Sequence, residues 1–130
     1  MLVVIDTNVL VSAFWSRDGV PAQIMALLLS QKIVPCYDER IMQEYEEVLL
    51  RPKFGFSAGE VRAVLDWGKY IGAVVIATPS KCEFVDETDR KFYENAKGSG
   101  AILITGNKKH FPKDSKIVSP REFLDLYFSL

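Results

Sequence analysis

Short apolar segments alternate along this chain with longer segments whose apolar residues recur at helical spacing. The first covers residues 2–5, Leu-Val-Val-Ile, and further strand candidates lie at residues 32–36, 73–77, 101–105 and 117–118. Strands that are apolar throughout are buried on both faces, which is typical of a parallel sheet covered by helices. Right-handed crossovers then predict an α/β fold, a three-layer α/β/α sandwich around a central parallel sheet of four to five strands.

Helix-start signals delimit the segments between these strands. Asp38 and Ser57 are expected to be the N-caps of helices that run to about residue 50 and about residue 70, and Glu60 would complete a capping box with Ser57. Pro21 suits the first turn of another helix, and a further one begins near Val9. The last two helices are expected over residues 87–97 and 120–128.

Composition limits the classes of protein that this chain can represent. Its 130 residues predict a single domain over residues 1–130. The chain has 16 Lys plus Arg against 17 Asp plus Glu, a net charge of −1, which excludes bulk-charge coating of nucleic acid but permits a local basic patch. No apolar run reaches the roughly 18 residues of a membrane span, and no signal peptide precedes the first strand. We therefore expect a cytoplasmic protein with no membrane partner.

Two strands end in polar clusters, at the edge where parallel sheets hold their functional crevice. Asp6 follows the first strand directly and is expected on the floor of this crevice, although it could instead cap the next helix. The second cluster, Thr105-Gly106-Asn107, follows the strand at residues 101–105. The hydroxyls of Thr7 and Thr105 could orient a metal-bound water, or could serve only to pack the strand ends.

Two more carboxylates lie on or beside apolar helix faces. Glu44 is about 40° from Val48, at the border of an apolar stripe, where it could also be a solvated boundary residue. Asp89 precedes Phe92 and Tyr93 by three and four residues and shares their inward face, although a first-turn aspartate can simply cap its helix. A buried carboxylate is costly unless it is paired or bound to a metal.

Together, Asp6, Glu44 and Asp89 come from three elements that can converge at one rim of the sheet. Clustered carboxylates repel one another, and a hard divalent cation such as Mg²⁺ or Mn²⁺ resolves the conflict. Such a metal activates water and stabilises charge on a phosphodiester oxygen. The single histidine and the separated Cys36 and Cys82 exclude a zinc set, and the cysteines are expected to be small buried hydrophobes.

Four motifs, in this order, resemble those of the PIN domain family, and the match covers nearly the whole chain. The first is Asp6-Thr7-Asn8-Val9-Leu10, and the second is residues 44–49 running into Arg51-Pro52-Lys53-Phe54. The third is residues 86–92 leading to Ala96, and the fourth is the strand end and loop at residues 103–112. Each motif alone is weak, whereas the ordered set is fairly specific.

The resemblance implies a metal-dependent nuclease with Mg²⁺ or Mn²⁺ as its cofactor. Stand-alone PIN proteins of this size are similar to toxins of toxin–antitoxin pairs, which implies an endoribonuclease with an RNA substrate and an antitoxin partner. Asp6, Glu44 and Asp89 match the acidic catalytic and metal-site positions of the family. Asn107 matches the fourth, where many relatives carry Asp and others Asn, so a second metal would be held weakly. Asp86 could compensate or be structural.

Other interpretations stay open at this point. The chain could be a catalytically silent PIN-like module that binds RNA or protein, which Asn107 favours, or another metal-dependent phosphohydrolase that acts on small phosphate esters. The basic residues after the last motif could contact phosphate or form a solvated loop, and His110 could act as a general base. These residues are Lys108, Lys109, His110, Lys113 and Lys116. Trp15, Met25 and Leu28 could form a symmetric homodimer interface or belong to the core.

Overall fold

The computed structural model describes residues 1–130 and contains one parallel sheet of five strands, in the order β3-β2-β1-β4-β5. Three of the four residues of the central strand β1 are buried, and its Val3 and Val4 are fully shielded from solvent. This burial explains why the first segment of the chain is apolar throughout. The strands are β1 (Leu2–Ile5), β2 (Val34–Tyr37), β3 (Ala73–Val74), β4 (Ile102–Ile104) and β5 (Ile117–Val118).

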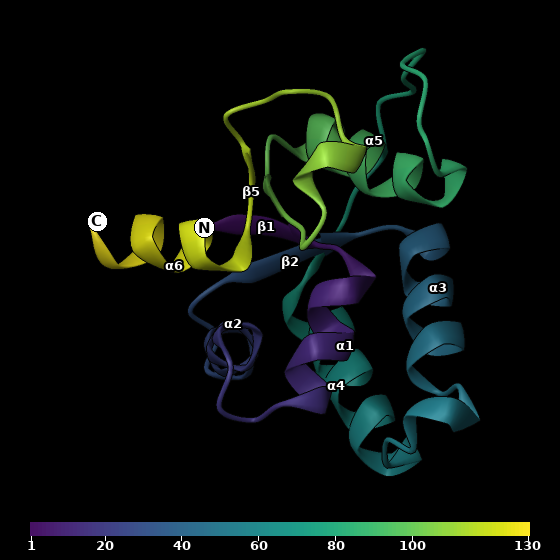
Figure 1. The fold of residues 1–130 in the computed structure, drawn as a ribbon, viewed down its shortest axis with the longest axis vertical. Helices are drawn as coiled ribbons and strands as arrows, with labels where there is room; N and C mark the ends of the chain where they lie inside the picture. The colour runs from purple at the N-terminus through teal and green to yellow at the C-terminus, as the bar shows by residue number, and fades with distance from the viewer.

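Six α-helices flank the sheet and complete the predicted three-layer sandwich. Helix α5 lies on one face, and α1, α2 and α4 lie on the other (Figure 1). Helix α3 packs beside α1 and α4, and α6 packs beside α2 and β5. The helices are α1 (Thr7–Trp15), α2 (Val20–Leu29), α3 (Glu39–Leu49), α4 (Ala58–Ile71), α5 (Arg90–Ser99) and α6 (Pro120–Phe128). None of them combines the length and the apolar character needed to span a bilayer.

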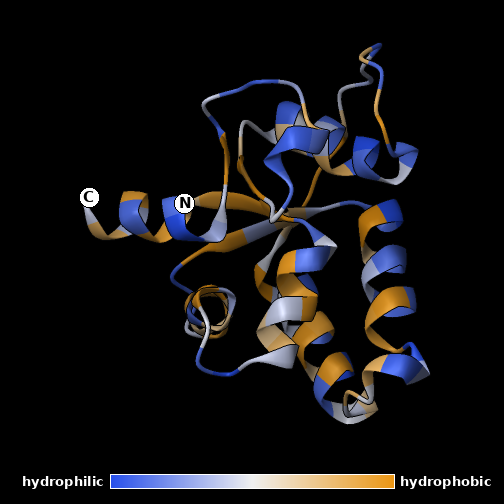
Figure 2. Ribbon diagram, in the orientation of Figure 1, coloured by the Kyte–Doolittle hydropathy of each residue, from blue (hydrophilic) through white to orange (hydrophobic).

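Apolar residues concentrate on the strands and on the helix faces that meet them (Figure 2). The largest fully buried side chains are Phe92 of α5 and Phe123 of α6. Leu28 is also buried in the core, which removes it from the suggested dimer interface, whereas Trp15 is 66% exposed. The two cysteines differ as well, because Cys36 is buried and Cys82 is exposed, contrary to expectation.

The helix expected over residues 87–97 is two elements. A short 3-10 helix, η2 (Glu87–Asp89), comes first, and α5 follows it and continues to Ser99. Asp86 causes the early turn, because its carboxylate accepts hydrogen bonds from the backbone and hydroxyl of Thr88. Helix α5 ends later than predicted because Gly100 has the left-handed conformation, φ 72°, that closes a helix.

Two other local predictions were wrong in part. The Ser57 hydroxyl does accept from the backbone N–H of Glu60 at 3.3 Å, but the reciprocal capping box is found at Ser119 and Glu122 instead. The strand expected over residues 73–77 pairs only at Ala73–Val74. It ends early because the chain turns away from the sheet, and the N–H of Thr78 donates to the Glu94 carbonyl at 3.1 Å.

The strand order reverses direction at β1. The chain builds β2 and β3 on one side of β1 and β4 and β5 on the other, so the switch point lies between β1 and β4, and open parallel sheets hold their functional crevice beyond the carboxyl ends of such strands. Ile5 pairs with Ile104 in this part of the sheet. Their successors, Asp6 and Thr105, therefore lie side by side at the crevice.

Candidate active site

Asp6 directly follows β1 at the carboxyl end of the strand and is only 5% exposed. Its Oδ2 accepts a hydrogen bond from the Thr105 hydroxyl at 2.8 Å. It occupies the N-cap position of α1, and its side chain bonds Thr105 across the sheet rather than making a capping hydrogen bond. Burial raises the pKa of Asp6 from 3.8 to about 6, the Thr105 hydrogen bond opposes the rise, and the charges of Asp89 and Glu44 add to it.

The polar segments that follow β1 and β4 are joined by hydrogen bonds. The Asn8 side-chain oxygen accepts from the Gly106 N–H at 3.1 Å. The Asn107 N–H donates to the Thr105 hydroxyl oxygen at 3.0 Å, which leaves that hydroxyl's hydrogen for Asp6. These bonds fix the Asp6 carboxylate between two strand ends. The exposed Asn107 side chain lines a shallow pocket with Asn8.

Glu44 projects from the middle of α3 and is held by two partners. Its Oε2 accepts from the Thr7 hydroxyl, and its Oε1 is 2.7 Å from Lys91 Nζ. The side chains of Glu44 and Lys91 are 17% and 13% exposed, so water screens this ion pair only partly. The neighbouring Tyr45 hydroxyl donates to the Ile5 carbonyl, which ties α3 to the end of β1.

Asp89, at the end of η2, carries an oxygen without a hydrogen-bond partner. This oxygen, Oδ2, is buried, and His110 Nδ1 lies 3.5 Å away, too far for a good hydrogen bond. Burial raises the pKa of Asp89, the charge of Asp86 raises it further, and His110 opposes the rise. A buried carboxylate oxygen without a partner lowers the stability of the cation-free protein and therefore favours the binding of a cation.

Two residues near Asp89 have roles that the sequence left open or did not indicate. Asp86 is exposed and occupied with capping η2, which makes it a structural residue. Lys91, which the sequence analysis did not select, provides the cation beside Glu44. Helical periodicity does not reveal this role, because the partner of Lys91, Glu44, lies 47 positions earlier in the chain.

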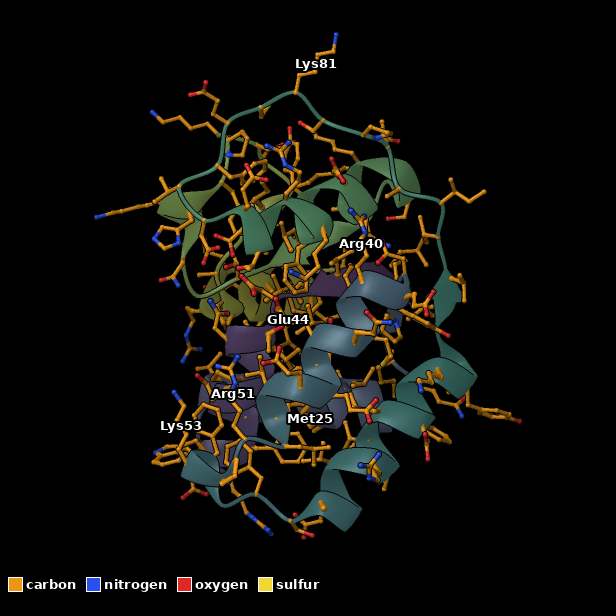
Figure 3. All side chains as sticks on the ribbon, turned by 90° about the vertical axis from the view of Figure 1, so that its right-hand side faces the viewer. Met25, Arg40, Glu44, Arg51, Lys53 and Lys81 are labelled. Carbon is orange, nitrogen blue, oxygen red and sulfur yellow. The ribbon has the colours of Figure 1, made fainter.

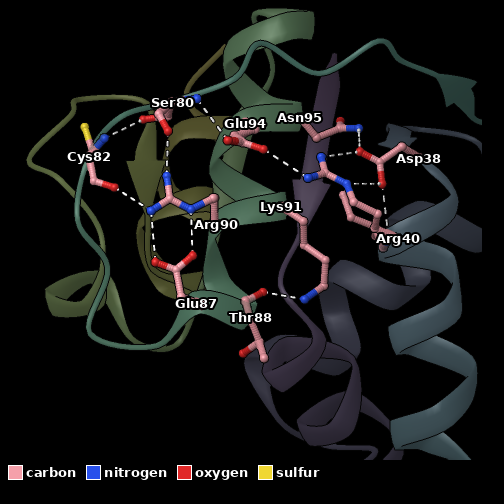
Figure 4. A network of polar contacts seen from close by, with 11 residues as sticks. Asp38, Arg40, Ser80, Cys82, Glu87, Thr88, Arg90, Lys91, Glu94 and Asn95 are labelled. Atoms are coloured by element: carbon pink, nitrogen blue, oxygen red, sulfur yellow. Dashed lines mark hydrogen bonds and ion pairs between the residues drawn. The ribbon is translucent and has the colours of Figure 1, made fainter.

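A polar network positions α3 against α5 (Figure 4). Arg40 bridges Asp38 at 2.9 Å and Glu94 at 3.0 Å, and Asp38 also accepts from Asn95 at 3.2 Å. These contacts hold the start of α3 beside α5. Glu44 of α3 and Lys91 of α5 then face each other one turn further along.

The segment before η2 is held by a second set of contacts in the same network. Arg90 donates to the carbonyls of Ser80 and Cys82, at 2.6 and 2.7 Å, and forms an ion pair with Glu87 at 2.7 Å (Figure 4). Asp89 directly precedes this arginine. The contacts therefore fix the backbone that presents the Asp89 carboxylate.

The three acidic residues fit a hard divalent cation in their chemistry, although their side chains do not form a closed site. No group of three or more His, Cys, Asp or Glu side chains is arranged to hold a metal ion. The donors available are all carboxylate oxygens, the ligands that Mg²⁺ and Mn²⁺ prefer. Asp89 Oδ2 has no hydrogen-bond partner and can accept a cation, and the pKa of Asp6 is raised first by burial and then by the charges of Asp89 and Glu44.

The expected basic patch is partly occupied with structural contacts. Lys108 forms an ion pair with Glu122 at 2.8 Å, and Lys116 Nζ donates to the Gly100 carbonyl at 2.9 Å. The His110 side chain is partly exposed, and its Nδ1 lies 3.5 Å from Asp89 Oδ2. Lys109 and Lys113 are the members of the patch without such partners.

Comparison with known proteins gives two matches. A family model described as a PIN domain matches residues 2–109, a segment that contains Asp6, Glu44, Asp89 and Asn107. An uncharacterized protein of Methanocaldococcus jannaschii is 33% identical over 138 aligned residues, which cover 95% of this chain and 89% of that protein. No solved structure matches the chain.

Proposed function

Because the chain belongs to the PIN domain family, whose fold is of the nuclease type, we propose that it is a divalent-metal-dependent endoribonuclease. Its reaction is the hydrolysis of RNA phosphodiester bonds. The observation that carries this proposal is the buried Asp6 carboxylate, whose pKa is raised by burial and by the charges of Asp89 and Glu44, together with the Asp89 oxygen that has no hydrogen-bond partner.

Asp6, Glu44 and Asp89 are the residues that would hold Mg²⁺ or Mn²⁺. When bound, such a metal lowers the pKa of a water molecule and stabilises negative charge on a phosphodiester oxygen. Thr105 and Thr7 orient the carboxylates of Asp6 and Glu44 through their hydroxyls. Lys91 offsets part of the acidic charge, which reduces the repulsion that an incoming phosphate meets. Asn107, whose N–H donates to the Thr105 hydroxyl that holds Asp6, would offer a neutral fourth oxygen.

The decisive experiment compares cleavage of a labelled single-stranded RNA by the wild type and by Asp6→Asn, in Mn²⁺ and in EDTA. We expect wild-type cleavage only with Mn²⁺, and no cleavage by Asp6→Asn because an amide binds the cation more weakly than a carboxylate. Asp66→Asn is the matched control, because it makes the same change on the exposed part of α4. An Asp6→Asn protein that cuts RNA at the wild-type rate would overturn the proposal.

Thermal unfolding distinguishes the metal-dependent nuclease from the alternative, a catalytically silent binding module. A cation that binds only the folded state raises the melting temperature, so Mn²⁺ should stabilise the wild type and not Asp6→Asn. A wild type that binds RNA but neither gains stability from Mn²⁺ nor cuts would instead be the silent module. Hydrolysis of a generic phosphate ester without cleavage of RNA would identify a small-ester phosphohydrolase.

The cellular role within this proposal is that of a toxin with a protein antitoxin. Its resemblance to small stand-alone PIN proteins supports the role, and an apolar groove of about 630 Å³ between α1, α2 and α4 offers a surface for a protein partner. Induced expression of the wild type should arrest growth of a host, whereas Asp6→Asn should not. Equal growth of the two strains would refute the toxin role and leave the nuclease assignment intact.

A further inference from the structure

Aromatic side chains gather where the end of α1 meets η1 (Pro52–Phe54), away from the carboxylates. Trp15, the last residue of α1, meets Phe54 and Phe56 edge-on, with ring centroids 6.2 and 6.0 Å away. The rings of Phe54 and Phe56 stack on each other at 5.2 Å with an angle of 7°. Trp15 is 66% exposed although the rings beside it are half-buried. We call Trp15, Phe54 and Phe56 the aromatic platform.

Cationic side chains flank this platform. Lys53 Nζ lies 5.1 Å from the centre of the Phe54 ring and its residue is exposed. Arg51 is 43% exposed and forms an ion pair at 2.9 Å with Glu47, whose side chain is 68% exposed. Exposed pairs of this kind are weak, so the Arg51 guanidinium can exchange its partner for a phosphate.

Helices α1 and α3 connect the platform to the carboxylates of Asp6 and Glu44. Helix α1 begins at Thr7, beside Asp6, and reaches Trp15 after a rise of about 12 Å. Helix α3 packs beside α1 and carries Glu44, and the chain continues past its end to Arg51 and Lys53. Figure 3 shows Glu44, Arg51 and Lys53 following one another down the same side of the molecule.

We propose that the aromatic platform, with Lys53 and Arg51, binds a single-stranded RNA segment next to the bond that is cut, an inference that rests on the proposed function. Unpaired bases stack on Trp15, and the phosphates contact Lys53 and Arg51. Stacking on aromatic rings combined with cationic backbone contacts is how proteins hold single strands without reading their sequence. A duplex binds poorly here, because its bases already stack on one another.

Charge supports RNA over a protein as the occupant. The whole chain has a net charge of −1 and its candidate active site is acidic, so a polyanion must find its favourable contacts in a local basic region. Lys53 and Arg51 supply such a region on the path away from the carboxylates. The platform therefore presents rings and cations together, the combination that a nucleic-acid strand needs.

Fluorescence anisotropy of labelled oligomers in EDTA tests the proposal, because binding is then measured without cleavage. The probes are oligouridine, an RNA duplex, and an abasic ribose-phosphate oligomer that has the charge of RNA without bases. Trp15→Ala should bind oligouridine roughly tenfold more weakly than the wild type and Trp15→Tyr should keep most of the affinity. Tyr70→Ala is the matched control, since Tyr70 is an exposed aromatic on α4, 81% accessible, and its loss should change nothing.

The abasic oligomer separates the contribution of base stacking to the binding affinity from that of the phosphate charge. Trp15→Ala should leave its affinity unchanged, whereas Lys53→Gln should weaken both oligomers and reduce the salt dependence of log K by about 0.7 for one lost phosphate contact. Wild-type affinity for the duplex should be lower than for oligouridine. Circular dichroism of each variant, together with the milder Trp15→Tyr change, shows whether the fold is retained.

Several outcomes would overturn the proposal. They are unchanged oligouridine affinity in a folded Trp15→Ala protein, an equal loss of abasic-oligomer affinity, or tighter binding of the duplex than of the single strand. Self-association of the wild type that Trp15→Ala abolishes, with RNA affinity unchanged, would assign the platform to a protein interface. These results are independent of cleavage, so a chain that cuts RNA without using the platform is distinguished from one that does not cut RNA.

Discussion

The hydroxyl of Thr105 donates to Asp6 Oδ2 at 2.8 Å, and Thr105 is completely buried. The same hydroxyl oxygen accepts from the Asn107 N–H at 3.0 Å. One side chain therefore supports both the buried carboxylate and the loop that follows β4.

The first prediction concerns this hydroxyl. Thr105→Val keeps the shape of the side chain but leaves Asp6 Oδ2 and the Asn107 N–H without their partner, so the free energy of unfolding should fall by about 1–3 kcal/mol at neutral pH. Urea unfolding measures this loss. Thr105→Ser is the control and should keep most of the stability. Equal stability of the Val and Ser variants would mean that the hydroxyl does not support the carboxylate.

A second prediction follows from the raised pKa of Asp6. The folded protein holds this proton more tightly than the unfolded chain, with a pKa of about 6 against 3.8. The ionised carboxylate therefore costs stability above pH 6, by up to about 3 kcal/mol, and this cost disappears as the pH falls through 6 toward 3.8. In EDTA, Asp6→Asn should be more stable than the wild type at neutral pH.

The pH dependence of that difference is the critical measurement. The gap in unfolding free energy between Asp6→Asn and the wild type should shrink as the pH is lowered and should vanish below 3.8. Using the difference removes the contributions of other carboxylates, such as Asp38, whose pKa is lowered by its hydrogen bonds to Arg40 and Asn95. A gap that stays constant over this range would exclude Asp6 as its source.

The elements of the fold were largely predictable from the sequence because each depends on local patterns. The apolar run at residues 2–5, the edge strand at residues 117–118 and the helix at residues 120–128 agree with the observed bounds. Asp38 does cap α3, accepting from the N–H of Ile41. The helix expected over residues 87–97 was predicted as one element, whereas the turn at Asp86 makes residues 87–89 a separate 3-10 helix before α5.

The location of Asp6 was also predictable, since a carboxylate after a buried strand must lie at the end of the sheet. Its partners were not. The pairing of Glu44 with Thr7 and Lys91 depends on the packing of three elements, and no spacing within one element encodes it. That Asp89 Oδ2 has no hydrogen-bond partner was not predictable either, because it depends on the distance at which η2 and His110 pack.

The third prediction concerns the ion pair between Lys91 and Glu44. Lys91→Met keeps the length of the side chain but removes the cation, which should lower the unfolding free energy in EDTA by about 1–3 kcal/mol. Mn²⁺ should then stabilise this variant more than it stabilises the wild type, because the cation replaces the missing positive charge. Thermal unfolding with and without Mn²⁺ measures both effects.

Lys109→Met is the control for this measurement, because Lys109 is exposed and makes no ion pair. It should change neither the stability in EDTA nor the shift caused by Mn²⁺. If Mn²⁺ stabilises Lys91→Met no more than it stabilises the wild type, the charge of Lys91 does not influence cation binding at the candidate site.

A fourth prediction tests the place of Asn107. Asn107→Asp adds a hard anionic oxygen and, if residue 107 belongs to the site, should tighten Mn²⁺ binding, as measured by calorimetry. The cleavage rate should not rise in proportion, because a metal held by more ligands loses the open position that water or substrate needs. Asn107→Ser is the control without the new charge. Unchanged Mn²⁺ affinity and unchanged cleavage in the Asp variant would place Asn107 outside the site.

The hydrogen bond between Asp6 and Thr105 joins residues 99 positions apart. A chain that is still being synthesised, or one cut short before residue 105, lacks the Thr105 hydroxyl that holds Asp6 and the edge strand β5. Assembly of the carboxylate site is therefore coupled to completion of the sheet. If the chain is the ribonuclease proposed above, an unfinished or truncated copy would be inert toward the RNA around it, including the message that encodes it.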